Sequence, residues 1–235
     1  MERRDFMGAC SGALLCSAMA APQPLFARTA KPQSYERVRL LDANGGPLRA
    51  SDLPKRRNLV FTYPYVATPA FLLDLGKPAA PTSGLPDANR QSYAWPGGVG
   101  PSRSIVAFAA ICAHQLAYPT REISFISYRD KAGGANRRGE VIHCCAEHSQ
   151  YDPAAGARVL AGPAPHPLTA ILLEYDAASD SLAATGTLGG EVYDAFFAKY
   201  DFRLAMEFGG RERSLVSGET RVLPLEQVCR PQVRC

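Results

Sequence analysis

The sequence predicts an all-β fold, an antiparallel β-sandwich or small barrel assembly, followed by a helix-containing C-terminal extension. Short segments rich in β-branched, aromatic and aliphatic residues recur between clusters of Gly, Pro, Asn and Asp, which is typical of antiparallel strands joined by turns. After Gly189-Gly190 the apolar residues take helical spacing instead. The segments interpreted as strands are 37–41, 58–63, 104–111, 123–128, 140–144, 157–160 and 170–175.

Two of the connections are long. Residues 77–103 are rich in Pro and Gly and are expected to form an extended loop, whereas 123–144 is expected to contain a hairpin. In 191–208, EVYDAFFAKYDFRLAMEF, the large apolar residues fall at helical spacing, and Gly209-Gly210 follows. We expect this amphipathic helix to pack against the β core.

Composition and charge restrict the class of protein. A chain of 235 residues suits one well-buried domain with appendages or two small domains. The content of 46% hydrophobic and 20% charged residues is that of an ordinary globular protein. The net charge is only +4 and the basic residues are scattered, so the sequence argues against a nucleic-acid partner.

The N-terminal segment 1–27 has the layout of an export signal. Arg3 and Arg4 precede an apolar run over 6–21, and Ala18-Met19-Ala20 offers a small-residue cleavage site. The paired arginines resemble a twin-arginine signal, which implies a periplasmic protein exported already folded. The apolar run is shorter than the roughly 20 residues that span a bilayer. A cleaved signal is therefore favoured over a retained inner-membrane anchor, and membrane contact is expected only if the segment is retained.

Two short stretches concentrate metal-binding side chains. They are Cys112-x-His114 in CAHQL and Cys145-x-x-His148 in CCAEHSQYD, so each supplies one thiolate and one imidazole. Structural zinc sites more often pair two cysteines locally and then two histidines. The mixed order suits a two-metal unit in which each loop donates its cysteine to one iron and its histidine to the other.

With these two boxes the chain resembles the Rieske [2Fe–2S] proteins, whose boxes follow C-x-H and C-x-x-H. The proline-rich segment GPAPHPL, 162–168, resembles the loop that shields the family's cluster, and 170–186 resembles the strand pair that closes its domain. The resemblance covers roughly 36–190 and implies a Rieske-type β-sandwich with a small cluster-binding subdomain. The division is then 1–27 signal or anchor, 36–190 Rieske domain and 191–235 extension, whose role stays open.

The resemblance implies a [2Fe–2S] cofactor and a set of residues around it. Two neutral imidazoles replace two thiolates on one iron, which raises the reduction potential above that of all-cysteine clusters. Hydroxyl groups after the second box would tune the potential further. The implied ligands are Cys112, His114, Cys145 and His148; the implied neighbours are Ser149, Tyr151, Gly162, Pro163 and Pro165.

Departures from the family pattern leave one ligand open. Respiratory members carry an extra cysteine in each box, joined as a disulfide, and the matching positions here are Ala117 and Glu147. If the second box is instead aligned with the family pattern backwards from Tyr151, Cys144 becomes the ligand and Glu147 stands at the position of the ligand histidine. Because glutamate is a poor substitute, we assign Cys145 and keep Cys144 as the alternative.

The tail contains a further pair of cysteines. In an oxidising compartment Cys229 and Cys235, in CRPQVRC, would close a small ring; free thiols are the alternative. His143 precedes the cysteine pair and is expected to point to the face of its strand opposite Cys144.

The sequence thus predicts a periplasmic electron carrier without substrate chemistry of its own. It would act as the iron–sulfur subunit or partner of a respiratory oxidoreductase, either a quinol-oxidising cytochrome complex or a molybdoenzyme. Its partner would be a cytochrome or molybdoenzyme subunit, with quinol as a further candidate. The alternatives are a zinc-stabilised binding module without a redox role and the Rieske component of an oxygenase system. An oxygenase would need further histidines for a mononuclear iron site, and none follows residue 166.

Overall fold

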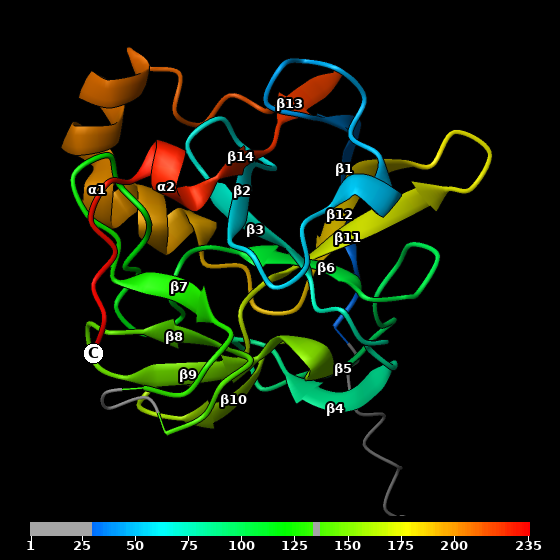
Figure 1. Cartoon of the computed structure of the whole chain (residues 1–235). Helices are drawn as coiled ribbons and strands as arrows, with labels where there is room; N and C mark the ends of the chain where they lie inside the picture. The colour runs from blue at the N-terminus through cyan, green and yellow to red at the C-terminus, as the bar shows by residue number, and fades with distance from the viewer. Residues whose placement is uncertain (1–29, 134–136) are drawn as a thin grey trace, which may run out of the picture.

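The computed structural model describes residues 30–133 and 137–235, and its architecture is the expected all-β one with a C-terminal helix (Figure 1). Each predicted strand segment overlaps an observed strand, although the strand expected at 37–41 begins at Gln33 and the one expected at 123–128 begins at Ile126. The strands Pro69–Asp74 and Ser149–Asp152 were not predicted. The expected signal or anchor, 1–27, lies outside the described residues. Within the described part of the chain, no helix is long and apolar enough to cross a membrane.

The largest sheet has eight strands in the order β13-β1-β12-β11-β6-β3-β2-β14. Its two edge strands, β13 and β14, are separated in sequence only by Val222, so the edges meet and the sheet closes into a barrel. The side-chain oxygens of Thr62 and Thr220 lie 3.3 Å apart across this closure. The strands are β1 (Gln33–Leu41), β2 (Leu59–Thr62), β3 (Pro69–Asp74), β6 (Ile105–Ala109), β11 (Ala170–Asp176), β12 (Ser181–Leu188), β13 (Glu219–Arg221) and β14 (Leu223–Pro224).

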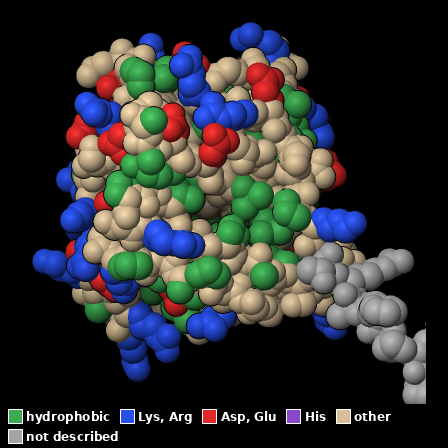
Figure 2. Space-filling view, turned by 90° about the vertical axis from the view of Figure 1, so that its right-hand side faces the viewer, with side chains coloured by type: hydrophobic (Ala, Val, Ile, Leu, Met, Phe, Trp, Pro, Cys, Tyr) green, Lys and Arg blue, Asp and Glu red, His purple; other side chains and the backbone are tan. Residues whose placement is uncertain are grey.

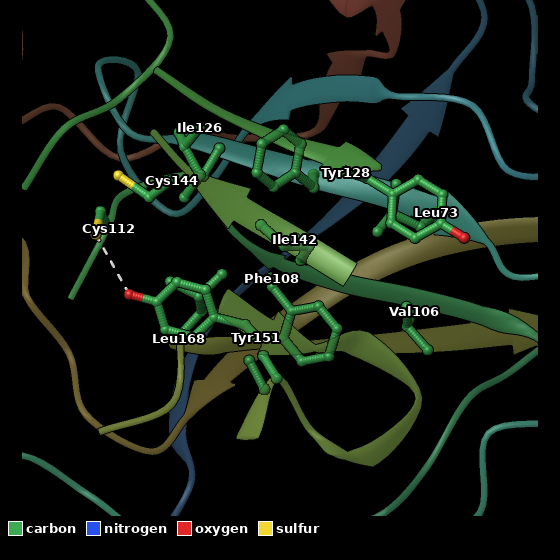
Figure 3. Packing of buried hydrophobic residues seen from close by; sticks show 14 of the residues in the cluster. Leu73, Val106, Phe108, Cys112, Ile126, Tyr128, Ile142, Cys144, Tyr151 and Leu168 are labelled. Carbon is green, nitrogen blue, oxygen red and sulfur yellow. Dashed lines mark hydrogen bonds between the residues drawn. The ribbon is translucent and has the colours of Figure 1, made fainter. Parts of the chain in front are cut away.

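Strands β3 and β6 are buried on both faces, which explains their unbroken apolar sequences. Leu72 and Ala107 belong to the core inside the barrel, whereas Phe71 and Phe108 belong to a second core on its outside. The outer core lies between the barrel and a smaller sheet, as Figure 3 shows. These two strands therefore form a wall between the barrel and the smaller sheet, which are the two halves of the molecule.

The smaller sheet has four antiparallel strands in the order β10-β9-β8-β7. The predicted hairpin is confirmed, with Ile126 paired to Cys144 across β7 and β8. Cys144 is also paired with Ser149, so residues 145–148 form a tight connection between β8 and β9. This sheet and its loops are the expected subdomain. Its strands are β7 (Ile126–Arg129), β8 (Val141–Cys144), β9 (Ser149–Asp152) and β10 (Arg158–Ala161).

The Pro/Gly-rich segment 77–103 is more ordered than expected. It contains an antiparallel hairpin of β4 (Thr82–Pro86) and β5 (Ser92–Trp95). Trp95 packs against Phe108 of the shared wall, with ring centroids 5.7 Å apart. The sequence did not predict this hairpin because its strands are short and largely polar, and the aromatic contact to the wall holds it in place.

The C-terminal segment is part of both halves of the molecule. Helix α1 (Tyr193–Phe208) is confirmed and ends at Gly209, whose φ of 61° is the left-handed value that favours glycine at a helix end. Phe196 of α1 makes an edge-to-face contact with Tyr118 at 4.9 Å. The segment then supplies β13 and β14 to the barrel, continues through α2 (Leu225–Val228) and ends beside β7 and β8 (Figure 1).

The surface has no block of a single charge on the face that Figure 2 shows. Lys and Arg side chains are spread over it, with Asp and Glu between them. Several basic residues are paired with acids, for example Arg37 with Glu174 at 3.1 Å.

Candidate metal centre

Two buried thiols meet where the barrel and the smaller sheet face each other. Cys112 follows strand β6 and Cys144 ends strand β8, and each is 1% exposed. The neighbouring Cys144 side chain lowers the pKa of the Cys112 thiol to about 5. The neighbouring Cys112 side chain and burial raise the pKa of Cys144. The two cysteines thus lie side by side, as two ligands of one metal ion would (Figure 3).

Tyr151 adds a hydrogen bond to this pair. Its side chain is fully buried, and its hydroxyl oxygen lies 3.3 Å from Cys112 Sγ. The same oxygen accepts the backbone N–H of Ala113 at 3.2 Å, so its own proton is directed to the sulfur. Burial, followed by the neighbouring Cys112, raises the pKa of Tyr151 above its ordinary value. The phenol therefore remains a hydrogen-bond donor to the Cys112 thiolate.

A second pair of donors lies beside the thiols. His114 Nδ1 is buried without a hydrogen-bond partner in the described structure and lies 3.6 Å from Glu147 Oε2. Glu147 is half-exposed and accepts a hydrogen bond from the Gln115 side chain at 3.1 Å. Nitrogen and oxygen ligands bound at about 2.1 Å to one tetrahedral metal lie about 3.4 Å apart. The His114–Glu147 separation is close to that value.

The thiol pair and the His114–Glu147 pair do not converge on a single point. Within the described ranges, the only set of three or more metal-binding donors lying within 4.8 Å of one another is His143, His148 and Cys235. The donors around Cys112 therefore form two separate pairs. Such an arrangement suits two metal ions better than one tetrahedral zinc ion.

The structure corrects the assignment of Cys145. Cys145 forms a disulfide with Cys235, with Cα atoms 5.7 Å apart, so its sulfur is not free to bind a metal in this state. Neighbouring residues at a strand end point to opposite faces, so Cys144 points inward to Cys112 and Cys145 points to the tail. Cys144, the alternative in the sequence, is therefore the cysteine of this pair that lies beside Cys112, and Glu147 rather than His148 lies beside His114.

The expected Cys229–Cys235 disulfide is also wrong. Cys229 is a buried free thiol whose sulfur contacts the Pro231 carbonyl oxygen at 3.3 Å. The tail continues past it beside the segment that leads into β7, where the Ser124 N–H donates a 3.0 Å hydrogen bond to the Pro231 carbonyl oxygen. Cys235 is thereby carried to the end of β8 and away from Cys229.

His148 does not join Cys112 and His114. Its φ of 60° turns the backbone at the connection between β8 and β9, and its ring lies 5.7 Å from that of His143. The structure thus groups His148 with His143, on the face of β8 opposite Cys144. The sequence did not predict that His148 lies beside His143. It did predict, from the alternation of side chains along a strand, that His143 lies on the face opposite Cys144.

The remaining predicted neighbours belong to strand β9 and to the proline-rich loop 162–168. Ser149 is buried, and its hydroxyl has no hydrogen-bond partner in the described structure. Gly162, with φ of 85°, packs so closely that a Cβ there would lie 2.5 Å from Ser149 Cα. Pro163 and Pro165 are exposed on the outside of this loop. Leu168 is buried in the core that contains both cysteines. The proline loop therefore covers the connection that carries the second box.

Fold and site together define an all-β protein with a buried dithiol between two loops, arranged as a candidate metal centre. No family model matches the chain. Among solved structures, the chain is similar to the soluble domain of the Rieske protein II from Sulfolobus acidocaldarius, with 27% sequence identity. The match covers 59% of this chain and 80% of that one, at a TM-score of 0.41.

Proposed function

We propose that this chain is an electron-transfer protein whose site holds one Rieske-type [2Fe–2S] cluster. Cys112 and Cys144 would bind one iron, and His114 and Glu147 the other. The observation that carries the proposal is the separation of these donors into a thiolate pair and an imidazole–carboxylate pair. The cluster would supply reversible one-electron transfer, and the protein supplies the surroundings that fix its potential.

The residues around the thiols have distinct tasks in this proposal. Tyr151 donates to Cys112 and stabilises its negative charge. The packed core around Phe108 and Leu168 excludes water from the sulfurs. Glu147 places a negative carboxylate where a second neutral imidazole was expected. The potential is therefore expected below that of a cluster with two histidines and above that of an all-cysteine one.

A docking region for a redox partner adjoins the second donor pair. His114 is three-quarters buried and Glu147 half-buried, and a cavity of about 380 Å³ beside them is bounded by helix α1. Lys199 of α1 donates to the Gln115 carbonyl oxygen at 2.6 Å and so joins the helix to the first box. An electron would leave or enter the protein here, because Glu147 is half-exposed and lines this cavity.

The export signal extends the proposal to location and partner. A cluster inserted in the cytoplasm must cross the membrane inside a folded protein, which the twin-arginine route permits. The chain would then work in the periplasm, with a cytochrome or a molybdoenzyme subunit as partner. Quinol is the small-molecule alternative.

The decisive test combines metal analysis with EPR on the full-length protein. Iron and acid-labile sulfide at two per chain, with a rhombic EPR signal of low average g after dithionite reduction, are expected. Cys112→Ser and Cys144→Ser should each abolish the signal, whereas Cys229→Ser, a buried free thiol elsewhere in the core, should keep it. Zinc without iron would instead indicate the structural zinc module, and a signal that survives Cys144→Ser would contradict the ligand assignment.

A further inference from the structure

A second group of metal-binding side chains lies on the face of β8 opposite Cys144. The ligand atoms of His143, His148 and Cys235 all lie within 4.8 Å of one another. Cys145, bonded to Cys235, brings a second sulfur to the same place. The group contains two sulfurs and two imidazoles, which is the donor set of a tetrahedral zinc site.

The surroundings of His143 are unusual for a buried imidazole. The side chain is fully buried, and buried polar groups are nearly always hydrogen-bonded to oxygen or nitrogen partners. In the described structure, the hydrogen-bonding partner of its ring nitrogens is the Cys235 sulfur, 3.8 Å from Nδ1 and 3.7 Å from Nε2. Sulfur and nitrogen bound to one zinc ion at 2.3 and about 2.05 Å lie about 3.6 Å apart. The Cys235 sulfur thus lies at about the spacing of two zinc ligands from each ring nitrogen.

The tail is held in place without the disulfide. Val233 donates its N–H to the Ser124 carbonyl oxygen at 2.8 Å, and Ser124 donates to the Pro231 carbonyl oxygen at 3.0 Å. The Arg129 guanidinium donates a further hydrogen bond to the Val233 carbonyl oxygen. Figure 1 shows the C-terminus beside the end of β8. Cys235 would therefore stay next to Cys145 and His143 if the disulfide were opened.

We infer that the Cys145–Cys235 disulfide controls a zinc site formed by Cys145, Cys235, His143 and His148. A thiol reductant would supply two electrons and two protons: the S–S bond breaks, two S–H bonds form, and two reductant thiols become a disulfide. Zinc would then bind both sulfurs and both imidazoles, and the two thiol protons would pass to solvent. Thiol–disulfide exchange with a small-molecule disulfide, which takes up the two electrons and is reduced to two thiols, would re-form the S–S bond and release the metal.

The reductant and the zinc ion both have access to the site. Cys235 lines a cavity of about 510 Å³ whose wall includes Arg129 and Arg234. The Arg129 guanidinium nitrogen lies 4.0 Å from Cys145 Sγ, where a positive charge stabilises the thiolate that leaves during reduction. His148 is exposed and offers a path for the ion from solvent. This site is separate from the Cys112–Cys144 centre, which lies on the other face of β8.

The experiment counts zinc by native mass spectrometry on the full-length protein before and after reduction. A phosphine serves as reductant, because it competes weakly for zinc. The reduced protein is expected to bind one more zinc ion per chain than the oxidised protein. With cobalt in place of zinc, the additional ion should show thiolate-to-cobalt charge-transfer absorption.

Variants identify the donors. His148→Gln removes an exposed ligand and should abolish the additional zinc, whereas Cys112→Ser should keep it because that cysteine belongs to the other centre. Alkylation of two further cysteines after reduction confirms that the disulfide has opened. With the disulfide open, an unchanged zinc count overturns the inference, and so does an additional zinc that persists in His148→Gln.

Discussion

The phenolic oxygen of Tyr151 lies 3.3 Å from the sulfur of Cys112, and the backbone N–H of Ala113 donates to the same oxygen. Strand β9 and the loop after β6 are far apart in the sequence, so this contact joins the smaller sheet to the barrel. It also directs one buried hydroxyl proton to one sulfur. The stability of a negative charge on the Cys112 sulfur therefore depends on the hydroxyl group of Tyr151.

Replacing Tyr151 by Phe should lower the reduction potential of the proposed [2Fe–2S] cluster. Removing a hydrogen bond to a thiolate that carries more negative charge in the reduced state favours the oxidised state by ~1 kcal/mol, or about 40 mV for one electron. A redox titration followed by EPR measures the shift. Tyr93→Phe is the control, since the Tyr93 hydroxyl is buried without a hydrogen-bond partner in the described structure. Equal potentials in the two variants would contradict the role of Tyr151.

Glu147→His should raise the potential by on the order of 100 mV. The substitution exchanges an anionic ligand for a neutral imidazole, and histidine ligation separates Rieske clusters from all-cysteine clusters by more than this amount. Redox titration provides the measurement. Glu174→His, an exposed position on strand β11 of the barrel, should leave the potential unchanged. If Glu147→His also has no effect, Glu147 is not a ligand.

Gly162→Ala should displace the proline loop from the second box. The Cβ would lie 2.5 Å from Ser149 Cα and 2.6 Å from the His148 carbonyl oxygen, and a φ of 85° is unfavourable for alanine. We expect a loss of about 2 kcal/mol in the free energy of unfolding, measured by urea denaturation. Gly133→Ala meets no atom within 4 Å and should cost under ~1 kcal/mol. Similar stability of both variants would show that the loop is not closely packed.

Phe108→Ala should destabilise the whole molecule. Phe108 is fully buried in the wall that the barrel shares with the smaller sheet, and its loss should cost about 3–5 kcal/mol in urea denaturation. Phe202→Ala, at a helix position that is 78% exposed, should cost less than about 0.5 kcal/mol. Two separate unfolding transitions in Phe108→Ala would show that the two halves unfold independently once their wall is weakened. A small change in a single transition would contradict the shared core.

Local sequence predicted helix α1, the two stretches rich in Cys and His, and the strands β1, β2, β6, β7, β8, β10 and β11, but it did not predict β3 or β9. Apolar periodicity and turn residues act over a few positions, so they were sufficient for the strand positions and for the helix end at Gly209. The sequence did not predict the hairpin in 77–103, because this hairpin is stabilised by a contact between Trp95 and the distant Phe108. The sequence also did not predict that β13 and β14 close the barrel, because the strands with which they pair lie far away in the sequence.

The sequence by itself determined that soft ligands gather around Cys112 and in CCAEH, and that hydroxyls follow them at a defined spacing. Only the tertiary structure decided which of the two adjacent cysteines faces Cys112. Their side chains leave the end of β8 in opposite directions, and the partner on each side comes from a distant segment: Cys112 for Cys144, and Cys235 for Cys145. The fold brings Cys112 and Cys235 to opposite sides of this strand end and so determines which cysteine each one meets. The spacing of residues along the sequence does not show this.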